Sequence, residues 1–186
     1  MLIYHNRIER KNICTRGNAM KAVELASAFI QLYGNSSYLT NMKINKLVYF
    51  AYAHAIQRGD KLFDDKIEAW KYGAVIPSVY HALKAHKNMG ITTTDIATSD
   101  KALREAKATW ALYGYMTASD IMNFCHRGGS AWKAVYNGAD HATINDSDIL
   151  ASTDGKETPV KEQTSGYAMD KLIEKRMGLL RMLENA

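Results

Sequence analysis

The sequence predicts a mainly α-helical, compact single domain of several helices, with a short extended or β segment near residues 65–76 and an amphipathic C-terminal helix. Three observations predict this fold class. The chain has 186 residues, of which 47% are hydrophobic and 23% charged, as is ordinary for one globular domain. Apolar residues recur every three or four positions over several segments, as on the buried face of a helix. Capping residues precede these segments, and glycines follow several of them.

The first two expected helices have the clearest patterns. Residues 18–33 place apolar side chains at helical spacing on one face. The next helix begins at Thr40 or Asn41, because either side chain can accept a hydrogen bond from the free amides of a first turn. It ends before Gly59. Its apolar stripe is wide, which is typical of a helix at the centre of a fold.

The segment over residues 62–77 does not keep a helical period. Its side chains alternate around Trp70 and Tyr72, which predicts a short strand or an extended loop with aromatic anchors. Pro77 then favours a new helix start. Further helices or turns are expected after capping residues, at Ser99 or Asp100, at Thr117 or Ser119, at Ser130, and at Asn145 to Asp148.

We divide the chain into a basic N-terminal arm (1–17), a helical domain (18–150), a linker (151–165) and a C-terminal helix (166–186). The linker is assigned from its polar, glycine- and proline-containing composition. The C-terminal helix has an apolar face that is too strong for a free tail. We expect this face to pack on the body of the protein, on a second copy in a homodimer, or on another partner.

Positive charge is concentrated in the first quarter of the chain. Residues 1–48 contain seven Lys or Arg and two Asp or Glu, which accounts for the whole net charge of +5. A local basic surface favours an acidic partner, either a protein or a nucleic-acid backbone. A nucleic-acid-binding regulator that uses this quarter is therefore one alternative function, and a solvated basic face is the plainer interpretation.

No recognisable catalytic or metal site is visible. The histidines and cysteines lack the spacing of zinc ligands, and the glycines lack a phosphate-binding fingerprint, so we expect no catalytic residue, metal or cofactor. Cys14 and Cys125 are far apart in sequence and are expected to be reduced thiols in a cytoplasm. The chain has no apolar run long enough for a signal peptide or a membrane span, and we expect no membrane partner.

One stripe of the second helix is suited to binding. Lys43, Lys46, Phe50, His54 and Gln57 recur every three or four residues and therefore share a face. Lysines beside an aromatic and a histidine suit an acidic, partly apolar protein partner. The plainer interpretation is that the lysines form the solvated side of a buried helix.

A small enzyme or nucleotide-binding protein is a further alternative. Lys43, Lys46, Tyr49, Trp70 and Tyr72 would surround its pocket, because aromatic rings and lysines together can hold a nucleotide. Such aromatics are more often core anchors.

The second helix and the segment after it resemble a known family. Residues 41–51, Asn-Met-Lys-Ile-Asn-Lys-Leu-Val-Tyr-Phe-Ala, resemble the signature helix of the Panacea domain, the SocA-like antitoxin or GepA phage-associated family. Residues 62–80 are similar to the family's next motif in order and spacing, and Ser130-Ala131-Trp132 is similar to its S-P-W motif. The resemblance covers about residues 19–150. The family has Gln at Asn45 and Pro at Ala74 and Ala131, and we expect the two missing prolines to loosen their loops.

The resemblance implies a non-enzymatic antitoxin or phage-encoded inhibitor in a bacterial cytoplasm. Such a protein neutralises a toxin or a host defence protein by direct contact. Together, the residues and the resemblance predict a partner-binding surface on the second helix and the aromatic segment after it. Its members are Lys43, Lys46, Tyr49, Phe50, His54, Gln57, Trp70, Tyr72, Tyr80 and Trp132.

Overall fold

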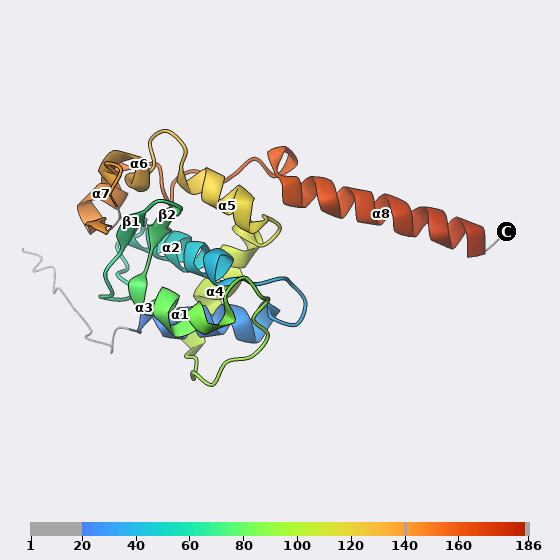
Figure 1. The fold of residues 1–186 in the computed structure, drawn as a ribbon, viewed down its shortest axis with the longest axis horizontal. Coiled ribbons are helices and arrows are strands. Elements are labelled where there is room, and N and C mark those ends of the chain that lie inside the picture. The colour runs from blue at the N-terminus through green and yellow to red at the C-terminus, as the bar shows by residue number, and fades with distance from the viewer. Residues whose placement is uncertain (1–19, 140, 185–186) are drawn as a thin grey trace, which may run out of the picture.

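A computed structural model of the chain describes residues 20–139 and 141–184 (Figure 1). The predicted basic arm and Cys14 lie outside the described residues. The described part is mainly helical, as predicted, with eight α-helices, two short 3₁₀ turns and three short strands. In chain order they are α1 (Ala22–Tyr33), α2 (Asn41–Gln57), β1 (Glu68–Trp70), β2 (Gly73–Val75), α3 (Pro77–Leu83), η1 (Lys84–His86), α4 (Asp100–Tyr113), α5 (Ala118–Cys125), α6 (Ala131–Val135), β3 (Ala142–Thr143), α7 (Asp146–Ala151), η2 (Lys161–Gln163) and α8 (Ser165–Glu184).

Helix α2 is the centre of the fold. It contacts α1, α3, α4, α5, α7 and β2, so other elements cover it on several sides (Figure 1). Leu47, Val48, Tyr49 and Phe50 are fully buried along it. Burying one large apolar side chain stabilises the fold by about 1.5–3 kcal/mol, so this helix contributes much of the driving force for folding.

The helix starts follow the predicted capping chemistry. The hydroxyls of Thr40, Ser99 and Ser130 each accept a hydrogen bond from a backbone amide in the first turn of α2, α4 and α6. Thr117 and Asp120 form a reciprocal capping box at the start of α5. These side chains satisfy amides that have no partner inside their helices.

The segment near residues 65–76 forms an antiparallel hairpin. Strand β1 pairs with β2 in the register Glu68 to Val75 and Trp70 to Gly73, and it also pairs with β3, which gives the order β2-β1-β3. The sequence predicted a single extended segment here. The turn depends on Gly73, which has a φ of 99° and lies so close to Lys46 and Cys125 that a side chain would crowd them.

Ala74 and Ala131, which replace the family's prolines, are not in loose loops. Both are fully buried. The amide of Ala74 donates to the Cys125 sulfur, and the amide of Ala131 donates to a carboxylate oxygen of Asp154. A proline has no amide hydrogen and could make neither bond. The expected loosening is therefore wrong for the structure, because each alanine supplies a contact that a proline cannot.

The first part of the segment expected to be a linker is built into the core. Asp154 is fully buried, and the amide of Thr153 donates to the carbonyl of Gly129. The chain is therefore part of the packed domain at least as far as Asp154.

Helix α8 extends away from the other elements (Figure 1, red). Its amides at Ser165 and Gly166 donate to the Asp120 carboxylate, which fixes the start of the helix. Beyond that point its apolar side chains Met169, Leu172, Ile173, Met177, Leu180 and Met182 are exposed. Of the three alternatives expected for this face, packing on the body is contradicted by these exposed side chains, and packing on a second copy or on another partner stays a prediction. Among the described residues, no helix combines the length and the apolar character needed to cross a membrane.

Candidate functional site: an aromatic hollow on the central helix

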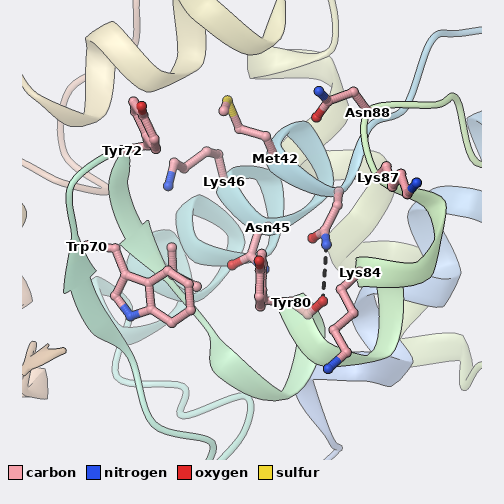
Figure 2. A pocket seen from close by; sticks show the side chains of 11 residues that line it. Met42, Asn45, Lys46, Trp70, Tyr72, Tyr80, Lys84, Lys87 and Asn88 are labelled. Carbon is pink, nitrogen blue, oxygen red and sulfur yellow. Dashed lines mark hydrogen bonds between the residues drawn. The ribbon is translucent and has the colours of Figure 1, made fainter. Parts of the chain in front are cut away.

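A hollow of about 220 Å³ lies between the first turns of α2, the β1–β2 hairpin and the α3–η1 segment (Figure 2). We call it the aromatic hollow, and its lining residues are Asn41, Met42, Asn45, Lys46, Trp70, Tyr72, Val75, Tyr80, Lys84, Lys87 and Asn88. Figure 2 shows Tyr72 and Met42 on one side of it and Trp70 and Tyr80 on the other.

The walls of the hollow expose large apolar side chains. Tyr72 is 55% exposed, Met42 38% and Tyr80 37%. The rings of Trp70 and Tyr80 meet edge to face with centroids 5.0 Å apart. Most soluble proteins bury such side chains, and aromatic residues gathered around a concave site are typical of binding surfaces.

The hairpin holds Trp70 in place. Its indole Nε1 donates to the Glu68 carboxylate at 2.8 Å, and its backbone oxygen accepts from Trp132 Nε1 at 2.7 Å. The ring of Trp132 also stacks on His126 and Tyr136. The predicted site residue Trp132 therefore supports the hollow from behind and does not line it.

Lys46 lies at the back of the hollow and is 1% exposed. Its ammonium group donates to the carbonyl oxygen of Ala74 at 2.6 Å, and within the described chain no carboxylate forms an ion pair with it. Burial lowers the pKa of Lys46 to about 8, and the nearby Cys125 partly opposes this shift. Burial correspondingly raises the pKa of the Cys125 thiol.

Two asparagines tie α2 to the rim. Asn45 accepts from the amide of Ile76 at 2.8 Å, and Asn41 donates to the carbonyl oxygen of Tyr80 at 3.0 Å. The side-chain oxygen of Asn41 has no hydrogen-bond partner, although this residue is only 6% exposed. An unpaired buried polar atom costs free energy, so it marks a place where a partner group would be favourable.

The stripe predicted on α2 is not a single exposed face. Tyr49 and Phe50 are fully buried, so the structure contradicts their expected surface position. Lys43 is also buried and lies on the other side of the helix from the hollow: its ammonium group donates to Gly114 and lies 5.0 Å from the Trp110 ring centroid. Burial lowers its pKa to about 8 as well. The prediction failed because elements cover α2 on both sides.

The C-terminal half of α2 holds the fold together through polar contacts. Tyr49 donates to Asp154 at 2.5 Å, and Gln57 donates to the backbone oxygens of Ile149 and Asp154. Arg127 pairs with the same Asp154 carboxylate at 2.8 Å. We call Tyr49, Arg127, Ala131 and Asp154 the buried hub. His54 bonds the hydroxyl of Tyr113, so it too has a partner inside the domain.

Sequence reasoning missed several residues of the hollow. Met42, Lys84 and Lys87 were absent from the expected site but line it. A signal for Met42 exists, because Met42, Asn45 and Lys46 are spaced by three and four residues and share a face that is rotated from the predicted stripe. Lys84 and Lys87 follow a helix whose position depends on tertiary packing, so the sequence carries no comparable signal for them.

Within the part of the chain that the structure describes, no three His, Cys, Asp or Glu side chains gather closely enough to hold a metal ion. The buried Cys125 has Lys46 and the Ala74 amide beside it. The arrangement of aromatic walls and lysines is suited to binding.

The chain is similar to known proteins over part of its length. Residues 44–133 match the family model described as antitoxin SocA-like, Panacea domain. The chain is also similar to the protein named Antitoxin SocA from Caulobacter vibrioides (strain NA1000 / CB15N), with 27% identity over 115 residues. That alignment covers 54% of this chain and 61% of the relative, so the chain spans less than two thirds of the relative's length. No solved structure matches the chain.

The matched segment contains most of α2, the hairpin, and α3 to the start of α6, and therefore most of the aromatic hollow. The resemblance predicted from the motifs is confirmed: residues 44–133 match the Panacea domain of the antitoxin SocA-like family.

Proposed function

We propose that this chain is a non-enzymatic, antitoxin-like protein that neutralises a toxin or a host defence protein by direct contact through the aromatic hollow. The observation that carries the proposal is the cluster of exposed Met42, Tyr72 and Tyr80 around a concave site, most of whose lining lies in the family-matched region. The name of the similar Caulobacter protein supports the antitoxin part of the proposal.

The composition of the hollow fits a protein partner. Trp, Tyr and Met are enriched in the cores of protein interfaces, and Trp and Tyr carry much of the measured binding energy there. Trp70 and Tyr80 support each other through their ring contact, so little side-chain freedom remains to be lost on binding. We place this activity in the cytoplasm of a bacterial cell, with a phage origin as one source of the chain.

Nucleic-acid binding is the less favoured alternative. Two of the seven basic residues in the first quarter, Lys43 and Lys46, are buried and donate to backbone oxygens inside the domain, so they do not form an exposed basic surface. Four others, Arg7, Arg10, Lys11 and Arg16, lie outside the described residues. Binding of random DNA that falls steeply with salt would favour this alternative.

A nucleotide-binding role is also less favoured. Small-molecule sites usually occupy about 300–1,000 Å³, and the aromatic hollow measures about 220 Å³. Of the residues expected around a nucleotide, Tyr49 and Lys43 do not line the hollow, so the structure separates that group. A rise in melting temperature with a panel of nucleotides would favour the role.

Co-expression with the product of the adjacent gene tests the proposal. The neighbour alone should stop growth, the full chain should restore it, and the two proteins should co-purify as a complex. A neighbour that is harmless and does not bind the chain would remove the antitoxin form of the proposal.

A further inference from the structure

We infer that the occupant of the aromatic hollow is a short acidic segment of the protein partner, which inserts one aromatic side chain between Tyr72 and the Trp70–Tyr80 pair and places carboxylates near Lys84, Lys87 and Lys46. This inference rests on the proposed function for the presence of a protein partner. It adds the chemical class of the segment that is bound.

The charge of the lining carries the inference. Three of the lining residues are lysines, and none is Asp or Glu. The neighbouring carboxylate of Glu68 is already engaged by Trp70 and by His141 at 2.9 Å. The hollow is therefore a positive site, and an acidic partner complements it.

Lys46, at the back of the hollow, supports the same argument for an acidic partner. Its buried ammonium group has one backbone acceptor and no carboxylate among the residues described. A buried charge without a counter-ion is costly, and an approaching carboxylate would reduce that cost. The exposed Lys84 and Lys87 at the rim can guide such a group toward the hollow.

The size and the walls specify the rest of the occupant. A volume of about 220 Å³ is small for a nucleotide but suits a single side chain. Trp70 and Tyr80 present ring faces and edges, and aromatic pairs in edge-to-face or offset geometry are favourable beyond their burial. The side-chain oxygen of Asn41, beside Tyr80, is an acceptor without a hydrogen-bond partner. After a small shift of this side chain, a backbone amide of the bound segment donates to it.

The test uses a phage-displayed library of random 12-residue peptides, selected on the full-length chain. Counter-selection uses a Lys84→Glu/Lys87→Glu variant, so that peptides held elsewhere are removed. We expect enrichment of peptides with an aromatic residue flanked by Asp or Glu. Enrichment of basic or purely aliphatic peptides, or equal retention by the charge-reversed variant, would overturn the inference.

Enriched peptides are then synthesised and titrated against variants by calorimetry. Tyr72→Ala and the Lys84→Glu/Lys87→Glu variant should each weaken binding about tenfold or more. Arg104→Glu/Lys107→Glu, an exposed pair on α4 with the same spacing, should leave affinity unchanged within about twofold. Equal losses in both charge-reversed variants would show a general electrostatic effect and contradict a site at the hollow.

The same variants separate this inference from the proposed function. If Tyr72→Ala loses neutralisation of the adjacent toxin while the Lys84→Glu/Lys87→Glu variant keeps it, the inference of an acidic segment fails and the proposed function stands. If acidic aromatic peptides bind the hollow while the toxin is not bound, the proposed function fails and the chemistry of the site stands.

Discussion

The two halves of helix α2 use polar side chains in opposite ways. In the C-terminal half, Tyr49 and Gln57 each bond Asp154 or its neighbours inside the domain. In the N-terminal half, Lys46 lacks a carboxylate within the described chain and Asn41 keeps an unpaired oxygen. Tyr49 and Gln57 in the C-terminal half form their hydrogen bonds within the domain. Lys46 and Asn41 in the N-terminal half retain hydrogen-bonding capacity that a partner can use.

We propose that α2 divides structural and binding roles between its two halves. The buried hub joins α2 to residues far along the chain, which stabilises a single arrangement of the domain. The aromatic hollow sits on a face where the hairpin and η1 stop short of covering α2. Changes in the hub should therefore reduce stability, and changes in the hollow should reduce binding.

The largest expected effect comes from the hub. Asp154→Asn removes the fully buried carboxylate that pairs with the half-buried Arg127 and accepts from Tyr49, and it should lower the free energy of unfolding by about 3–5 kcal/mol. Glu157→Gln is the matched control, because Glu157 also pairs with Arg127 but is exposed, and it should cost under about 1 kcal/mol. Urea unfolding measures both values. Equal stability of Asp154→Asn and the wild type would show that the hub is not structural.

The next effect is a pH dependence that reports the burial of Lys46. Its pKa is about 8 in the folded chain and 10.5 when unperturbed, so the unfolded chain holds more protons between these values. Stability relative to Lys46→Met should then rise by about 2 kcal/mol from pH 8 to pH 10. Cys125 titrates nearby but is present in both chains. Urea unfolding across this range gives the difference, and Lys84→Met serves as the control at an exposed lysine.

Ala131→Pro tests the buried hub with a smaller expected loss of stability. Ala131 is the first residue of α6, where a proline fits the backbone, so the main loss is the amide that donates to Asp154. We expect a decrease of about 1–3 kcal/mol in the free energy of unfolding. A thermal unfolding series measures it, and an increase in stability would mean that the Asp154 contact contributes little.

The smallest effect on stability is expected from the projecting helix. Removing residues 169–186 leaves the contacts of Ser165 and Gly166 with Asp120 and deletes exposed apolar side chains. The free energy of unfolding should stay within about 0.5 kcal/mol of the wild type at low protein concentration. A larger loss that grows with protein concentration would show that this helix forms a homodimer.

The sequence predicted the parts of this fold that depend on local chemistry. Helix starts at Thr40, Ser99 and Thr117 were predictable because a capping side chain acts on amides two or three residues away. The hub was not, because Tyr49 and Asp154 are separated by 105 residues. Nothing in the local pattern distinguishes Asp154 from a solvated turn residue.

The site too was predictable only where the signal is local in the sequence. The motif resemblance pointed to Trp70, Tyr72 and Tyr80, which do line the hollow. Helical spacing placed Lys43 and Lys46 on one face, but packing of β2 on one side and α4 on the other buried them in different surroundings. Periodicity describes which residues share a face, and tertiary packing decides what covers it.

The central claim is tested most directly by measuring affinity and stability on the same variants. Tyr72→Ala and Leu112→Ala each truncate an exposed side chain, the first in the hollow and the second on α4. We predict that Tyr72→Ala weakens binding of the protein partner at least about tenfold while unfolding free energy changes by less than about 0.5 kcal/mol, and that Leu112→Ala changes neither. Unchanged affinity in Tyr72→Ala, with the partner still bound, would contradict the assignment of the hollow as the binding surface.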